Sequence, residues 1–152
     1  MTKTILLAFL MLWSIAGFTQ EVKPTYDSTL AKSLGADDYG MKSYILAILK
    51  TGTYQTTDKA ILDSLFRGHM DNINRLAESG QLVVAGPMGK NDKQYRGIFI
   101  LNTTSMEEAA EWLNNDAAIN SKLFEVEYFP WYGSAALPAY MPVHKKIEKQ
   151  QH

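Results

Sequence analysis

The sequence predicts an α+β fold with the element order β-α-β-β-α-β, and two observations lead to this prediction. Short apolar runs bounded by turn residues are typical of buried strands, and longer stretches with apolar residues at three- and four-residue spacing are typical of amphipathic helices. This is the ferredoxin-like order, in which both helices cover one face of an antiparallel sheet. At 152 residues, the chain is long enough for one domain with its own core. The expected elements occupy residues 41–50, 58–79, 82–85, 95–102, 105–115 and 122–131.

The first two expected strands are apolar on both faces. Residues 82–85 are apolar throughout, and Gly86-Pro87 ends that strand because proline has no N–H for a strand ladder. Two helices can cover only one face of the sheet, so we expect the other face to meet a second copy of the chain in a homodimer. In residues 41–50, the two faces carry Tyr44, Leu46 and Ile48 on one side and Ile45, Ala47 and Leu49 on the other.

The expected helix at 58–79 carries a histidine, His69, inside its apolar stripe. Gly80 follows as the residue that accepts a positive φ at the helix end. Gly68 weakens this helix by about 1 kcal/mol relative to alanine, and a break beside His69 is the alternative. In the next expected helix, Ser105 and Glu108 form a capping box, and Asp116 projects from the inward edge at the end of the helix.

Composition and motifs exclude several classes of function. A net charge of −1 gives no basic surface for nucleic acid, and the absence of cysteine excludes disulfides and thiolate chemistry. No G-x-G-x-x-G or G-x-S-x-G motif is present, and the arginines form no phosphate clamp. His144 and His152 have no metal-ligand spacing with His69. We therefore expect no cofactor and no metal.

The two ends of the chain lie outside this pattern. Residues 1–19 combine a basic start, an apolar run and small residues, which predicts a signal peptide and export to the periplasm or the extracellular space; an uncleaved membrane anchor is the alternative. After cleavage, no segment is expected to lie in a membrane.

Residues 20–40 are a polar lead-in in which residues 26–34 could form a short helix. Residues 133–152 are a tail in which Pro138 and Pro142 argue against a continuing helix, with a solvated or disordered end.

An ordered series of motifs resembles the YCII-related family over residues 41–132. The resemblance implies a dimeric α+β barrel, and it places His69 at the position proposed as the family's general acid/base and Asp116 at the family's Asp-Pro position. Ala117 replaces the usual proline. The motifs are His69, Gly80 eleven residues later, the LVVAGP run at 82–87, Trp112, Asp116 and Phe129-Pro130-Trp131.

Each candidate residue has a structural reading beside the functional one. From the residues alone, His69 is either a buried histidine bonded to a backbone carbonyl or a proton-transfer group, since imidazole titrates near neutrality. Asp116 either orients that imidazole or organises the loop after the helix. Gly86, Pro87 and Met88 either line a pocket or simply end a strand.

Two classes of function remain. The first is a small cofactor-free enzyme that uses His69 and Asp116 for an isomerase-, lyase- or dehydrohalogenase-like step on a small cyclic or carbonyl-bearing molecule; these reaction types come from the fold's relatives. The second is an exported protein that binds a small molecule without turnover. The basic nitrogen of His69 distinguishes them, because only the enzyme needs it.

Overall fold

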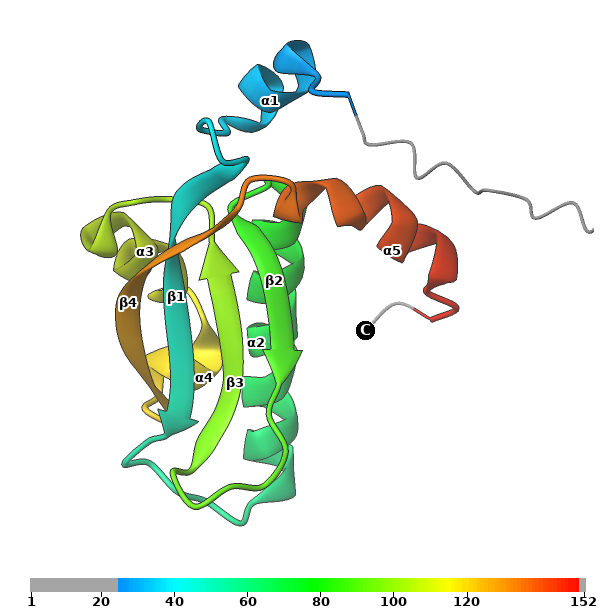
Figure 1. Cartoon of the computed structure of the whole chain (residues 1–152). Helices are drawn as coiled ribbons and strands as arrows, with labels where there is room; N and C mark the ends of the chain where they lie inside the picture. The colour runs from blue at the N-terminus through cyan, green and yellow to red at the C-terminus, as the bar shows by residue number, and fades with distance from the viewer. Residues whose placement is uncertain (1–24, 151–152) are drawn as a thin grey trace, which may run out of the picture.

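A computed structural model describes residues 25–150 of the chain (Figure 1). The predicted signal peptide lies outside the described residues and stays a prediction, which the intact mass of the protein from its native cell tests. The elements are α1 (Ser28–Leu34), β1 (Met41–Thr51), α2 (Lys59–Glu78), β2 (Leu82–Pro87), β3 (Tyr95–Leu101), α3 (Met106–Leu113), α4 (Ala117–Asn120), β4 (Phe124–Ser134), the 3-10 turn η1 (Leu137–Tyr140) and α5 (Met141–Ile147).

The sheet has four antiparallel strands in the order β2-β3-β1-β4, with α2, α3 and α4 together on one face (Figure 1). This confirms the predicted ferredoxin-like α+β fold. The main core lies between the sheet and these helices, where Ile45, Leu76, Leu101 and Leu113 are almost completely buried. The helices and this face of the sheet therefore exclude water together.

Helix α2 is continuous, so the break considered at Gly68 does not occur. Asp58 caps its amino end by accepting hydrogen bonds from the backbone N–H groups of Ala60 and Ile61, and Gly80 adopts a φ of +73° just beyond its carboxyl end. A side chain at position 68 would bring its Cβ to 2.7 Å from the Cβ of Ala117. Glycine is therefore present because α2 and α4 approach each other closely at this point.

The expected helix at 105–115 is shorter than predicted and a second helix follows it. Helix α3 ends at Leu113, and Asp116 begins the separate four-residue helix α4 instead of projecting from the end of α3. The physical reason is its cap: the Asp116 carboxylate accepts from the N–H groups of Ala118 and Ile119, which starts a new helical turn.

The C-terminal tail contains the 3-10 turn η1 and the helix α5, so the expectation of a non-helical tail is wrong. Pro138 and Pro142 each lie in the first turn of their elements, η1 and α5. Proline is tolerated there because the first N–H groups of a helix have no intrahelical partner. In addition, β4 continues to Ser134, three residues beyond its predicted end.

The face of the sheet that the helices leave open is apolar but only partly buried. A small cluster of Tyr44, Val83 and Ile100 is covered there by Trp131 and Leu137, and Phe129 of β4 is 44% exposed. The expectation that residues 82–85 are covered on both faces holds only in part, because Val84 is half-buried and Ala85 is exposed. Strand β2 is an edge strand, and this explains why it can end on Pro87.

Candidate active site

His69 and Asp116 form a buried pair between α2 and α4. The distance from His69 Nδ1 to Asp116 Oδ2 is 2.6 Å, and the residues are 47 positions apart in the chain. Asp116 is completely buried, and the His69 side chain is 10% exposed. The two predicted site residues therefore meet in a buried side-chain hydrogen bond.

The carboxylate of Asp116 uses both of its oxygens. Oδ1 accepts hydrogen bonds from the backbone N–H groups of Ala118 at 3.0 Å and Ile119 at 3.2 Å, while Oδ2 faces the imidazole. Asp116 thus caps α4 with one oxygen and contacts His69 with the other. Because a buried carboxylate needs such donors, they hold it at a fixed position.

Two phenylalanines fix the plane of the His69 ring. Phe99 of β3 stacks on the imidazole with ring centroids 5.9 Å apart, and Phe124 of β4 meets it edge-on at 5.4 Å. Phe124 in turn makes an edge contact with Phe66 of α2 at 5.9 Å. The imidazole is therefore packed between aromatic side chains.

The second ring nitrogen of His69, Nε2, differs from Nδ1 in its surroundings. Within residues 25–150, Nε2 has no hydrogen-bond partner, and every fully buried side-chain nitrogen or oxygen of that part of the chain has one. Nε2 is consequently not fully buried. A carboxylate on Nδ1 favours the neutral tautomer with the proton on Nδ1, which leaves a lone pair on Nε2.

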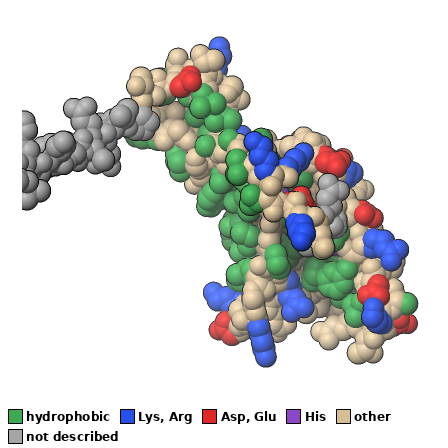
Figure 2. All heavy atoms as spheres, turned by 90° about the vertical axis from the view of Figure 1, so that its right-hand side faces the viewer, with side chains coloured by type: hydrophobic (Ala, Val, Ile, Leu, Met, Phe, Trp, Pro, Cys, Tyr) green, Lys and Arg blue, Asp and Glu red, His purple; other side chains and the backbone are tan. Residues whose placement is uncertain are grey.

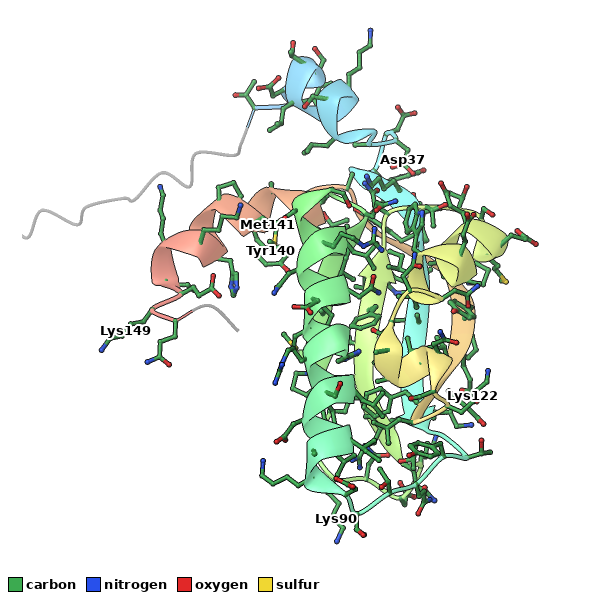
Figure 3. All side chains as sticks on the ribbon, turned by 180° about the vertical axis from the view of Figure 1, so that it is seen from behind. Asp37, Lys90, Lys122, Tyr140, Met141 and Lys149 are labelled. Atoms are coloured by element: carbon green, nitrogen blue, oxygen red, sulfur yellow. The ribbon has the colours of Figure 1, made fainter. Side chains whose placement is uncertain are left out.

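His69 lines a groove of about 1200 Å³. One wall is α2, the other is the edge strand β2 with the hairpin that follows it, and η1 and α5 border one end (Figures 1 and 3). Gly86, Pro87 and Met88 line this groove as well as ending the strand. Four of the five predicted site residues therefore line one cavity, and the fifth, Asp116, is buried behind His69. A smaller cavity of about 270 Å³ shares Phe66, Arg96 and Phe124 with it.

The alanine in place of the family's proline leaves the site intact. Ala117 is the first residue of α4, a position that suits proline and alanine alike. Its Cβ lies against Gly68, the residue next to His69. This close approach of α4 to α2 lets the short Asp116 side chain reach the imidazole.

Sequence reasoning missed several residues around the groove. Phe66, Phe99 and Phe124 were assigned only to the helix stripe and the strands, since nothing in the pattern of apolar residues marks a contact with His69. Tyr140 and His144 line the end of the groove, but they belong to the tail that was expected to be non-helical.

In residues 25–150, no helix is long and apolar enough to cross a membrane. The same residues contain no group of three or more His, Asp or Glu side chains placed to hold a metal ion.

The fold and the buried pair define a small α+β protein with a histidine–aspartate pair beside a groove. The sequence profile of the YCII-related domain matches residues 43–132, which is more than half of the chain. The chain therefore belongs to the YCII-related domain family, and the predicted resemblance is confirmed.

Among solved structures, the chain is similar to 5-chloro-2-hydroxyhydroquinone dehydrochlorinase from Burkholderia phenoliruptrix AC1100, determined in complex with 2,5-dihydroxybenzoquinone. The two are 19% identical with a TM-score of 0.40, and the similarity covers 57% of this chain and 92% of the other. No curated protein matches the sequence.

Replacing Asp116 with asparagine tests how much the buried pair stabilises the fold. Asparagine caps a helix as well as aspartate does, but it removes the charge that faces His69. Asp116→Asn should lower the free energy of unfolding by about 1.5–3 kcal/mol, the range for hydrogen bonds to charged groups. Urea unfolding measures this change.

Asp58→Asn is the matched control, because Asp58 caps α2 with the same pair of backbone bonds but faces solvent. Its effect should stay within about 0.5 kcal/mol. Equal effects of the two substitutions would mean that the bond to His69 contributes nothing.

Proposed function

We propose that this protein is a small cofactor-free enzyme in which His69 is the general acid/base and Asp116 orients it. The observation that carries the proposal is the 2.6 Å contact between His69 Nδ1 and a fully buried Asp116 carboxylate, at a histidine that lines the groove. A histidine held in one tautomer by a carboxylate is the arrangement that proton transfer requires. The substrate is a small cyclic or carbonyl-bearing molecule bound in the groove.

The reaction follows from the geometry of the imidazole. Nε2 takes a proton from a carbon next to a carbonyl group, and the electrons of that C–H bond move toward the carbonyl oxygen to give an enolate. The imidazolium is stabilised by Asp116, which keeps its charge. Return of the proton to another carbon gives an isomerisation, whereas departure of a group from the neighbouring carbon gives a lyase- or dehydrohalogenase-like elimination.

The surroundings of His69 support this role over a purely structural one. A structural histidine would bond both ring nitrogens inside the core, yet His69 has only the Asp116 bond among the described residues. The rings of Phe99 and Phe124 prevent the imidazole from turning and lower the local dielectric, which strengthens its interaction with Asp116.

We propose that two copies of the chain pair through the open face of the sheet. This face carries half-buried apolar residues on the two central strands, and Phe129 of β4 is 44% exposed on it. A stable obligate interface of this kind buries roughly 2,000 Å² or more in total. Together with the signal peptide expected at residues 1–19, the proposal is an exported homodimer; export is supported by the sequence alone.

Replacing His69 with glutamine tests the catalytic role. We expect the wild-type protein to accelerate proton–deuterium exchange next to the carbonyl of at least one member of a panel of small cyclic ketones in heavy water, followed by proton NMR. His69→Gln should lower that rate about 100-fold or more with binding largely retained.

His144→Gln is the comparison for this test, because His144 lines the same groove without a carboxylate partner among the described residues, and it should lower the rate far less than His69→Gln does. If His69→Gln exchanges protons as fast as the wild type, the groove binds its ligand without turnover. The exported binding protein is then the better account.

Replacing Phe129 with glutamate tests the dimer. The exposed side chain contributes little to the folded monomer, but a carboxylate within an apolar interface is costly to bury. Analytical ultracentrifugation at micromolar concentration should report twice the chain mass for the wild type and the single chain mass for Phe129→Glu.

Met106→Glu makes the same chemical change at an exposed residue of α3, in the helix layer, and should remain dimeric. A wild-type protein that is folded and monomeric at micromolar concentration contradicts the proposed pairing.

A further inference from the structure

We propose that Arg96 binds the anionic group of the substrate, so that the groove selects small planar organic anions such as aromatic carboxylates. The proposal deepens the proposed function, on which it rests, by naming the chemical class of molecule that His69 acts on. It makes Arg96 a specificity-determining residue at the hairpin end of the groove.

The backbone turns Arg96 out of the regular pattern of the sheet. Along β1 and β3, Leu49 pairs with Gly97, but Lys50 pairs with Tyr95, so Arg96 is an extra residue on β3. Such a β-bulge redirects a side chain and is common beside functional sites. Arg96 lines both the large groove and the smaller cavity that adjoins it.

The hairpin around this bulge is held firmly. The Asn91 side chain accepts from the backbone N–H of Tyr95 and donates to the Tyr95 carbonyl, at 3.0 and 2.8 Å. The backbone N–H of Met88 donates to the carbonyl of Arg96 at 2.8 Å. The backbone from which the Arg96 side chain extends is therefore held in place. A preorganised group loses less conformational entropy when it binds a ligand.

The charges that line the groove differ between its two ends. One end has two carboxylates, Glu78 at the carboxyl end of α2 and Glu148 just after α5, and one cation, Lys145 of α5. The opposite end has two cations and no carboxylate: Lys90 of the β2–β3 hairpin, labelled near the start of α2 in Figure 3, and Arg96 at the start of β3. Figure 2 looks onto this side of the molecule, where apolar and basic side chains both reach the surface. An anion in the groove is thus attracted toward the hairpin end.

Arg96 is also available to a ligand. It forms no ion pair with any residue in 25–150. A guanidinium presents several N–H donors in a planar fork that matches the two oxygens of a carboxylate.

Aromatic rings link Arg96 to the reactive histidine. Phe66 and Phe124 line both cavities together with Arg96, and Phe124 also contacts the edge of His69. A flat ring packed against these side chains lies between a proton-transfer group and a cation. This order of groups selects a planar molecule that carries negative charge at one end.

The test compares benzoate with benzamide, which share shape but differ in charge. Each probe is titrated into the full-length protein and followed by NMR through the Arg96 Nε–H and Phe124 ring signals. Benzoate should bind about tenfold more tightly than benzamide, as a charged hydrogen bond to Arg96 requires. Arg96→Gln should bring the two affinities together, and Arg96→Lys should restore part of the difference.

Arg67→Gln is the matched control, since Arg67 is exposed on α2 beside Phe66 but lines neither cavity. It should keep the full preference for benzoate. Equal affinities for the two probes in the wild type, no saturable binding of benzoate, or an equal loss in Arg67→Gln and Arg96→Gln would each overturn the proposal.

This outcome is separable from the catalytic proposal, because neither probe has a proton for His69 to move from carbon beside its carbonyl. The preference for benzoate should persist in His69→Gln. A retained preference without any catalysis leaves the anion site standing, and proton exchange without a preference leaves the catalytic role standing.

Discussion

The hydrogen bond between His69 and Asp116 is the constraint on which the rest of this structure depends. A fully buried carboxylate is costly unless donors surround it, and here the donors come from an imidazole and from two backbone N–H groups. The same side chain therefore begins α4 and holds the imidazole. A single carboxylate therefore both caps α4 and hydrogen-bonds to the histidine.

The packing of the helices follows from this constraint. Asp116 has a short side chain, so α4 must lie close to α2 for the bond to form. Gly68 makes the approach sterically acceptable, because any Cβ at that position would meet the Cβ of Ala117 at 2.7 Å. The loss of helix propensity at this glycine, about 1 kcal/mol, is offset by the contact it permits. Gly68, which lowers the helix propensity of α2, thus allows the close packing of α2 and α4 at the site.

Much of the fold could be predicted because its signals are local. The periodicity of apolar residues predicts the strands and α2, and residues such as Asp58 and Gly80 predict the two ends of α2. His69 and Asp116 could be paired in advance because both were expected on inward surfaces and both fit the family's motif. Their hydrogen-bond geometry required the structure, since it depends on residues that approach from different helices.

The features that escaped prediction depend on context. The start of α4 at Asp116 could not be separated from the end of α3, because a short helix of four residues leaves no periodic pattern. Pro138 and Pro142 were read as helix breakers, whereas they occupy first turns, where proline is tolerated. The bulge at Arg96 follows from the pairing register of β1 and β3, which no single strand sequence specifies.

The nitrogen NMR spectrum of the His69 ring in the wild-type protein tests the central claim most directly. At a pH where the ring is neutral, Nδ1 should carry the proton, donated to Asp116, and Nε2 should show the shift of an unprotonated nitrogen. A ring protonated on Nε2 would contradict the account, because the groove would then face a hydrogen-bond donor and no base.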